Sequence, residues 1–335
     1  MLVDAHAHLL PRDYPAGAPE CFPRMEPIEG STDRNLVFGG PRPFRARDVF
    51  FEAERRIEAQ DASGVDAEIL SPMPPLLRYD LPAADGLALA RHVNEFTAEL
   101  CESDPSRLIG LGMVPLADPE ASAAELAAVA GLGLRGVEIA SNILGYPIGD
   151  ERFLPFFAEA ERLGLAVFVH AMPTGESKLP MAARGTYMVG LEGATAAASL
   201  VTGGTAAKCP DLRICFSHGA GGYPLTLPRA QYFWSGAWNE EPVVPDRAIM
   251  HDDGPSPIEY ARRFYYDSLV FDRRALRYLV DLLGSGRLLV GSDFPAMRRE
   301  DPAGRTLRSL DLPPDQLADI TWNNAFRWLG ISPVR

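Results

Sequence analysis

The sequence predicts an α/β protein built as a closed (β/α)8 barrel, a TIM barrel. Three observations favour this fold. Short apolar segments alternate with segments of helical periodicity along nearly the whole chain of 335 residues. Eight such apolar segments can be distinguished, which matches the number of strands in this barrel. Most are near-continuous apolar runs, as expected of parallel strands that are buried on both faces.

The predicted strands are spaced so that a helix fits after each of them. They are residues 1–8 (MLVDAHAH), 66–72 (DAEILSP), 108–115 (LIGLGMVP), 134–141 (LRGVEIAS), 165–171 (LAVFVHA), 212–219 (LRICFSHG), 264–270 (FYYDSLV) and 287–295 (RLLVGSDFP). Between them apolar residues recur at steps of three and four, as on one face of a helix. The clearest cases are Leu89, Val93, Phe96 and Leu100, and then Leu276, Leu279, Val280 and Leu283. The last helix is expected within residues 315–330.

An open, doubly wound sheet is the alternative that the same alternation allows. A dinucleotide-binding sheet of that kind would carry a GxGxxG turn after its first strand, and no such motif follows residues 1–8. No internal repeat or linker divides the chain. We therefore expect a single barrel domain over residues 1–335. A small insertion is expected at about 11–47, with a hairpin in 35–47, and an irregular segment at 235–258.

Composition limits the classes of function. The formal net charge of −13 argues against nucleic acid or an anionic membrane as a partner. No segment approaches a membrane span, and the first residues lack the pattern of a signal peptide. The four cysteines form no CxxC pair and are too sparse for a disulfide framework. These features predict a protein of the reducing cytoplasm.

Polar residues gather where the predicted strands end. Asp4, His6 and His8 alternate in the first strand, so their side chains are expected on one side, with Asp4 one step deeper in a supporting role. His170 ends the fifth strand and His218 the sixth. In such barrels the carboxyl ends of the strands carry the active site.

Asp293, at the end of the eighth strand, adds a carboxylate to these four imidazoles. One histidine at a strand end would more often be structural, but five such groups at one rim are hard to explain by chance. Imidazole nitrogens together with a carboxylate are the ligands that a zinc-type divalent ion prefers. The constellation therefore predicts a metal centre.

The motifs DAHAHLLP, VFVHA, CFSHGAGG and VGSDFP, in this order on a barrel, resemble the amidohydrolase superfamily, in particular its metal-dependent decarboxylases. The resemblance implies that one Zn²⁺ per chain, or another divalent ion such as Mn²⁺, is bound by His6, His8, His170 and Asp293. It implies that His218 is the general base beside a water whose pKa the ion lowers to about 7. Relatives that bind two ions use a bridging lysine or glutamate on the fourth strand. Here that strand has no lysine, and Glu138 lies short of its end, so the resemblance favours one ion.

The resemblance also assigns residues to a small anionic carboxylic acid substrate. Arg47 and Arg229 would bind its carboxylate groups, because a guanidinium offers them a planar fork of donors. Tyr79 matches an aromatic residue of the substrate pocket. In the resembling family the second arginine enters from a neighbouring subunit, which implies a homodimer.

These inferences predict a cytoplasmic, zinc-dependent, non-oxidative decarboxylase of a small aromatic or muconate-semialdehyde-type acid, a reaction of aromatic-compound catabolism. His218 and Asp293 would be its catalytic residues. The alternative is a hydrolase that uses the same metal site on an amide, a lactone or a related carbonyl compound. The pair Arg47 and Arg229 argues against that alternative. A barrel that binds without turnover is disfavoured, because a binding protein has no need of His218.

Overall fold

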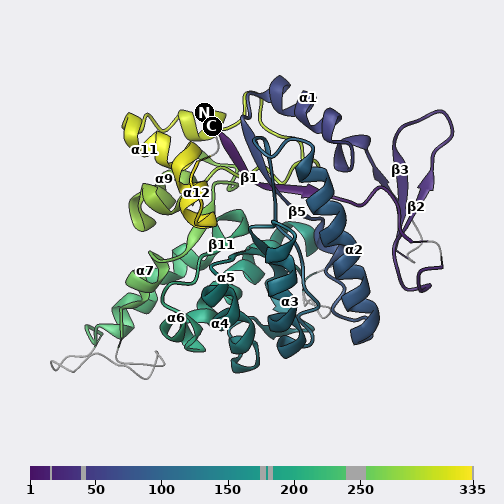
Figure 1. Cartoon of the computed structure of the whole chain (residues 1–335). Helices are drawn as coiled ribbons and strands as arrows, with labels where there is room; N and C mark the ends of the chain where they lie inside the picture. The colour runs from purple at the N-terminus through teal and green to yellow at the C-terminus, as the bar shows by residue number, and fades with distance from the viewer. Residues whose placement is uncertain (16, 39–42, 174–178, 180–183, 239–253, 334–335) are drawn as a thin grey trace.

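The computed structural model describes residues 1–335 except 16, 39–42, 174–178, 180–183, 239–253 and 334–335 (Figure 1). Each of the eight predicted strands contains a parallel strand of the described structure. These are β1 (Val3–Leu9), β5 (Ala67–Pro72), β6 (Leu108–Gly110), β7 (Gly136–Ala140), β10 (Ala166–His170), β11 (Ile214–Phe216), β12 (Tyr265–Asp267) and β13 (Leu288–Leu289). The predicted (β/α)8 barrel is confirmed.

Two parallel sheets join to form the barrel. One has the order β1-β5-β6 and the other β13-β12-β11-β10-β7. Parallel bridges connect them on both sides: Gly112 pairs with Val137, while Asp4 pairs with Val290 and Ala7 with Phe294. The first and last strands are therefore neighbours, although they lie at opposite ends of the sequence.

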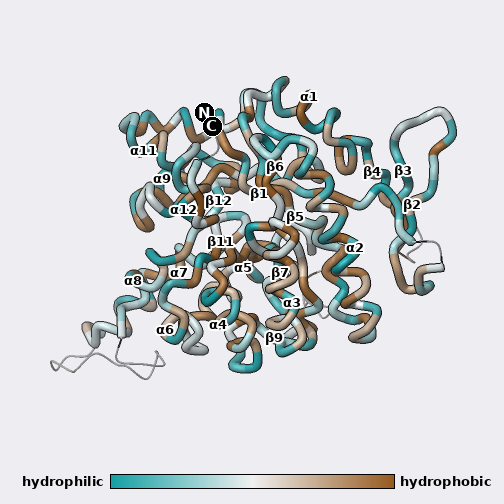
Figure 2. The backbone as a smooth tube through the Cα atoms, viewed as in Figure 1, coloured by the Kyte–Doolittle hydropathy of each residue, from teal (hydrophilic) through white to brown (hydrophobic). Residues whose placement is uncertain are grey.

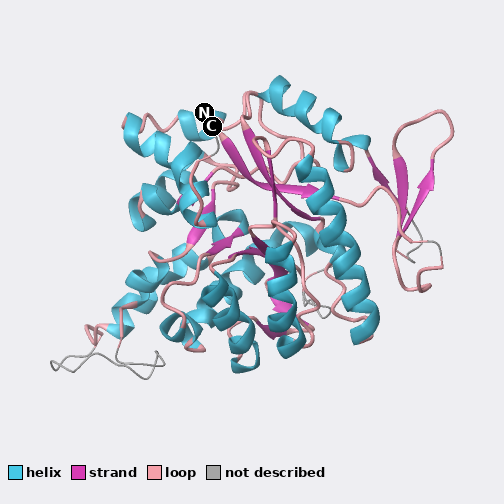
Figure 3. Cartoon of the chain, viewed as in Figure 1, coloured by secondary structure: helices cyan, strands magenta, loops and turns pink. Residues whose placement is uncertain are grey.

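Helices surround the strands (Figure 3). The main helices that follow successive strands are α1 (Ala53–Ser63), α2 (Ala83–Glu102), α3 (Pro119–Gly131), α4 (Leu154–Leu163), α5 (Val189–Thr202), α7 (Tyr223–Trp234), α9 (Arg273–Leu283) and α12 (Asn324–Leu329). Shorter helices are α6 (Thr205–Lys208), α8 (Pro257–Ala261), α10 (Arg305–Arg308) and α11 (Pro314–Ala318). Among the described residues, no helix combines the length and the apolar character needed to cross a membrane.

The segment after β1 forms a small antiparallel sheet that projects from the barrel (Figure 1). It contains β2 (Arg24–Pro27), β3 (Arg34–Val37) and β4 (Phe44–Ala46), in the order β2-β3-β4. The pairing of β3 with β4 is the hairpin expected in 35–47, although residues 39–42 between them lie outside the described residues. A second small sheet, β8 (Asn142–Ile143) with β9 (Tyr146–Pro147), follows β7. Most of the irregular segment expected at 235–258 also lies outside the described residues.

The barrel has an apolar floor. Hydrophobic residues concentrate in the central strands (Figure 2). Val3, Ala5 and Phe168 pack in one buried cluster with residues of α12, including Phe326 and Trp328. Phe168 contacts Trp328 on one side, with ring centroids 6.0 Å apart, and His6 on the other, at 4.9 Å. The polar centre described below therefore rests directly on this apolar layer.

Candidate metal centre

A register shift in β1 turns His6 and His8 toward the barrel axis. Asp4 pairs with Glu68 of β5, but Ala7 pairs with Leu70, so β1 holds one extra residue over this stretch. Such a bulge breaks the strict alternation of side chains. Asp4 consequently lies against Arg299, which donates to its carboxylate at 3.0 Å, and not beside the imidazoles. The prediction that Asp4 shares the side of His6 and His8 is therefore wrong.

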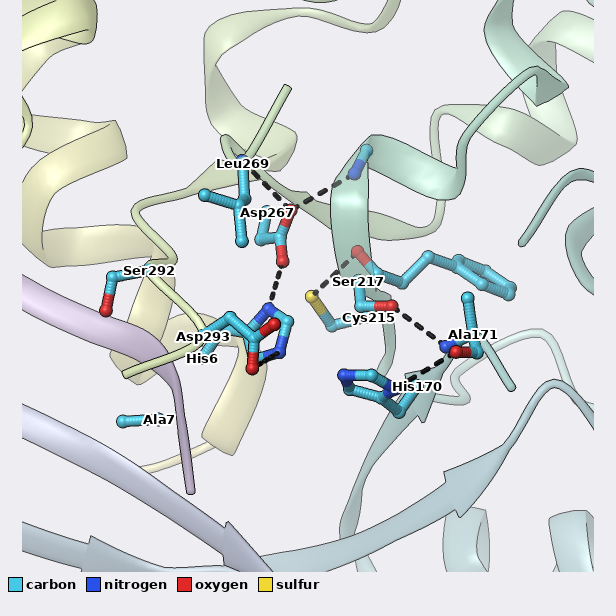
Figure 4. A network of polar contacts seen from close by, with 12 residues as sticks. His6, Ala7, His170, Ala171, Cys215, Ser217, Asp267, Leu269, Ser292 and Asp293 are labelled. Atoms are coloured by element: carbon cyan, nitrogen blue, oxygen red, sulfur yellow. Dashed lines mark hydrogen bonds and ion pairs between the residues drawn. The ribbon is translucent and has the colours of Figure 1, made fainter. Parts of the chain in front are cut away.

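Five predicted residues come together at the carboxyl ends of the strands. The Nε2 atoms of His6 and His8 are 3.2 Å apart. Asp293 Oδ1 lies 3.1 Å from His8 Nε2 and 3.8 Å from His6 Nε2. One ligand-type atom from each of His6, His170, His218 and Asp293 lies within 4.8 Å of the others. His6, His170 and Asp293 are seen to face one another in Figure 4.

The buried histidines and carboxylates of the cluster shift one another's pKa values. Burial lowers the pKa of His6, but the hydrogen bond and charge of Asp267, with Asp293 and Glu138, outweigh burial and raise it to about 9. Burial and the neighbouring imidazoles hold the pKa of His170 well below its ordinary value. Burial would raise the pKa of Asp293, but the hydrogen bond with His8 and the nearby imidazoles lower it. The cluster therefore contains a carboxylate and an uncharged imidazole at neutral pH.

The donor set fits a divalent cation. His170 Nε2 is buried and has no hydrogen-bond partner among the residues that the structure describes, which leaves a lone pair without the contact that buried polar atoms normally have. Its Nδ1 lies 3.2 Å from the carbonyl oxygen of Ala171, which selects the tautomer with a bare Nε2. Imidazole nitrogens and a carboxylate oxygen are typical ligands of Zn²⁺.

His218 stands at the edge of the cluster on a strained turn. It has φ 52° and ψ 38°, the left-handed region that non-glycine residues seldom adopt. Asp293 is also left-handed, with φ 58°. Such strain concentrates at functional sites, where the surrounding structure maintains it. Burial, the largest influence, lowers the pKa of His218, so its imidazole is neutral at pH 7 and able to accept a proton.

Two buried carboxylates to which the sequence analysis gave no role lie behind the imidazoles. Asp267, the last residue of β12, lies 2.6 Å from His6 Nδ1 through Oδ2. Glu138 of β7 lies 3.6 Å from His8 Nδ1 through Oε2, and burial raises its pKa to about 7. An aspartate at the carboxyl end of a barrel strand was the available signal for Asp267, since the same position singled out Asp293.

A cavity of about 830 Å³ opens over the cluster. His170, His218 and Asp293 line its end at the cluster, and Thr186 and Arg274 add polar groups elsewhere in the wall. Most of the remaining wall is apolar and comes from α5, α7, α9 and the loops around them, including Val189, Leu225, Val270, Phe271, Tyr278 and Met297. A cavity of this size and composition suits a small organic molecule with one polar end at the cluster.

The predicted substrate residues lie outside the described lining of this cavity. Arg47 is exposed and donates a 2.8 Å hydrogen bond to the carbonyl oxygen of Pro295, two residues after Asp293. Arg229 is exposed on α7, stacks on Phe233 and lines a separate groove between α5 and α7. Tyr79 is buried, and its hydroxyl oxygen accepts a hydrogen bond from the Ala140 N–H at the end of β7. Their roles toward a substrate stay predictions.

Fold and site together define a barrel protein with a histidine–carboxylate centre at the carboxyl ends of its strands. The chain belongs to the amidohydrolase family, whose model matches residues 3–331. It is 30% identical to 2-amino-3-carboxymuconate-6-semialdehyde decarboxylase of Dictyostelium discoideum over 340 residues, covering 99% of this chain and 92% of the relative.

Solved structures of decarboxylases share the fold. The 5-carboxyvanillate decarboxylase of Sphingomonas paucimobilis is 30% identical, with a TM-score of 0.72 and 83% of each chain covered. The dihydroxybenzoic acid decarboxylase of Polaromonas sp. JS666, solved with manganese and 2-nitroresorcinol, is 24% identical with a TM-score of 0.70. That match covers 83% of this chain and 85% of the other.

Proposed function

We propose that this protein is a metal-dependent, non-oxidative decarboxylase of a small aromatic or muconate-semialdehyde-type carboxylic acid. The observation that carries the proposal is the convergence of His6, His8, His170 and Asp293, with His218 beside them, under a largely apolar cavity. The similarity over nearly the whole chain to a decarboxylase of that substrate class supports the same reaction.

In this proposal His6, His8 and His170 provide three imidazole ligands, through the Nε2 atoms that face the cluster, and Asp293 provides a carboxylate. The nitrogen-rich donor set favours one Zn²⁺ per chain, and Mn²⁺ is the alternative. When bound there, the ion would stabilise negative charge and make a coordinated water more acidic.

His218 is proposed as the proton carrier. Its imidazole is neutral at pH 7, and it lines the cavity next to Asp293. Decarboxylation breaks the bond between the carboxylate carbon and the unsaturated carbon, CO₂ leaves, and the second carbon keeps the electron pair and takes up one proton. His218 can take a proton from water and deliver it to that carbon, in the role of general base and acid.

The cavity and the arginines are proposed to select the substrate. The apolar wall would hold the ring or conjugated chain, and the guanidinium groups of Arg47 and Arg229 would bind its carboxylates. Tyr79 would support the pocket through its hydrogen bond with Ala140 at the end of β7. Because Arg229 lies on α7 outside the described lining, we propose that it acts on the site of a second copy of this chain in a homodimer.

The compartment is proposed to be the cytoplasm. Cys21, Cys101, Cys209 and Cys215 are all free thiols in the structure, and two of them are buried. Unpaired cysteines are typical of a reducing compartment.

A substrate screen tests the proposed reaction. The zinc-loaded protein should release CO₂ from members of a panel of aromatic and muconic acids, and His218→Ala should release it about 10²–10⁴-fold more slowly. A matched panel of amides and lactones tests hydrolysis. Hydrolysis of these compounds without CO₂ release from any acid would replace the decarboxylase with a hydrolase.

A further inference from the structure

One carboxylate, that of Asp267, contacts both parts of the candidate metal centre. Asp267 is fully buried at the end of β12. Its Oδ2 lies 2.6 Å from His6 Nδ1, and its Oδ1 accepts hydrogen bonds of 3.1 Å from the N–H groups of Gly219 and Leu269. Figure 4 shows Asp267 with its contacts to His6 and Leu269.

The contact with His6 determines which ring nitrogen carries the proton. A carboxylate only accepts hydrogen bonds, so the Nδ1 of His6 must be the donor. His6 Nε2, which faces His8 and Asp293, is then the nitrogen available to a metal ion. Carboxylates placed behind metal-binding histidines orient the ring in this way and make it a stronger ligand.

The contact with Gly219 acts on the turn that carries His218. Residues 218–221 all have positive φ, at 52°, 60°, 57° and 56°. Two of these residues, His218 and Ala220, are not glycines, so the turn requires support from its surroundings. The hydrogen bond from the Gly219 N–H to Asp267 Oδ1 anchors the residue next to His218 to the carboxylate that orients His6.

Packing around the pair leaves no room for a side chain at Gly291. A Cβ atom there would lie 2.8 Å from the Cβ of Asp267 and 2.9 Å from the Cβ of His6. The bare backbone of residue 291 therefore permits the close approach of β1 and β12 that the 2.6 Å contact needs. Asp267 is therefore held in place by the packing of β12 against β1 and against the segment that follows β13.

We infer that Asp267 is a positioning residue that fixes the metal-binding tautomer of His6 and, through Gly219, the turn that aims His218. The inference rests on the ligand role of His6 in the proposed function. It concerns orientation, since Asp267 lies behind the imidazole and outside the described lining of the cavity.

Asp267→Asn is the sharpest variant. The amide oxygen can still accept from Gly219 and Leu269, but the amide NH₂ would donate to His6 Nδ1. Nδ1 must then be an acceptor, and the proton moves to Nε2, where it blocks the metal. Competition with a chromogenic chelator should show a loss of Zn²⁺ affinity of about 10–100-fold. Thermal melting of the metal-free variant checks that it is folded, and Asp267→Glu should recover part of the affinity.

Two comparisons separate this inference from the proposed site. His6→Ala must itself lose Zn²⁺; if it does not, the proposed ligand set fails. If His6→Ala loses Zn²⁺ and a folded Asp267→Asn binds it as tightly as wild type, the positioning role alone fails. Asp4→Asn is the matched control, because it neutralises a buried carboxylate of β1 that contacts Arg299 and the backbone N–H of His6 but, within the described parts of the chain, no imidazole ring. Asp4→Asn should keep its Zn²⁺ affinity. If it loses as much affinity as Asp267→Asn, Asp267 acts through its negative charge alone and the positioning role fails.

A measurement on the wild-type protein keeps the inference testable should Asp267→Asn not fold. Imidazole ¹⁵N NMR of the zinc-loaded chain, assigned with His6→Ala, should show His6 protonated at Nδ1 and coordinated through Nε2. Coordination through Nδ1 would overturn the inference.

Discussion

Arg56 holds the backbone of His8: its guanidinium donates a 2.6 Å hydrogen bond to the His8 carbonyl oxygen. Arg56 is fully buried on α1 and also donates to Glu68 at 2.8 Å. Glu68 in turn accepts a hydrogen bond from Arg299, which bonds to Asp4 as well. A chain of buried charges thus connects helix α1, strands β1 and β5 and the loop after Asp293.

Replacing Arg56 by methionine should destabilise the protein strongly. The substitution leaves Glu68 with one of its two cations and removes the donor to His8, and breaking a buried ion pair costs about 3–5 kcal/mol. Urea denaturation should show a loss of unfolding free energy of that order. Arg55→Met is the control: Arg55 is exposed and pairs with Glu58, so its loss should leave the free energy of unfolding nearly unchanged. Equal effects in the two variants would contradict a structural role for the buried network.

The same network predicts acid sensitivity. Burial would raise the pKa of Glu68, but Arg56 and Arg299 outweigh burial and hold it below its ordinary value of 4.5. A carboxyl group with a lowered folded-state pKa stabilises the protein above its unfolded-state pKa, and this contribution is lost as pH falls through the folded-state pKa. Unfolding free energy measured between pH 6 and 3 should therefore fall, and Glu68→Gln should show a shallower dependence. An unchanged slope would assign the acid sensitivity to other carboxylates.

Metal content tests the proposed ligands. Purified protein should contain close to one zinc-type ion per chain, and His6→Ala, His170→Ala and Asp293→Ala should each lose it, because each removes a ligand that the others cannot replace. Elemental analysis of the dialysed variants measures this directly. Full occupancy in a double His6/His8 variant would refute the assignment.

His218→Ala should separate base from ligand. His170 and His218 each offer a ligand atom within 4.8 Å of those of His6 and Asp293, so this distance limit does not distinguish the two roles. We expect the variant to retain its ion and to lose activity by about 10²–10⁴-fold, the usual contribution of a general base. A loss of metal equal to that of His170→Ala would make His218 a ligand.

Arg47→Ala and Arg229→Ala should leave the ion in place and weaken use of the acid. Loss of a charge pair from a largely desolvated pocket costs about 2–5 kcal/mol, so kcat/KM should fall sharply, and lysine should restore little.

Mixing Arg229→Ala with His218→Ala chains tests action across a dimer. Each mixed dimer would hold one site with its own base and an intact partner arginine, and recovered activity is expected. No recovery in a verified mixed dimer would place Arg229 elsewhere.

Much of the fold could be predicted because the strands are short apolar runs and the helices between them have apolar residues at steps of three and four. His6, His8, His170, His218 and Asp293 could be predicted as a group because a barrel brings all its strand ends to one rim. The bulge in β1 could not, since nothing in DAHAH marks the extra residue, and it reversed the side assigned to Asp4. The partnership of Arg56, Glu68 and Arg299 depends on the packing of distant segments, which periodicity does not encode.

The pairing of β1 with the last strand has a consequence for biosynthesis. His6 and His8 leave the ribosome well before Asp293, because β1 precedes all the other strands of the barrel. Asp4 and Ala7 meet their partners Val290 and Phe294 only when the barrel closes. A nascent chain therefore holds two imidazoles without their carboxylate while the segments between β1 and β13 are synthesised. The proposed ion would be acquired after closure, so that loading depends on the metal supply met by the closed barrel.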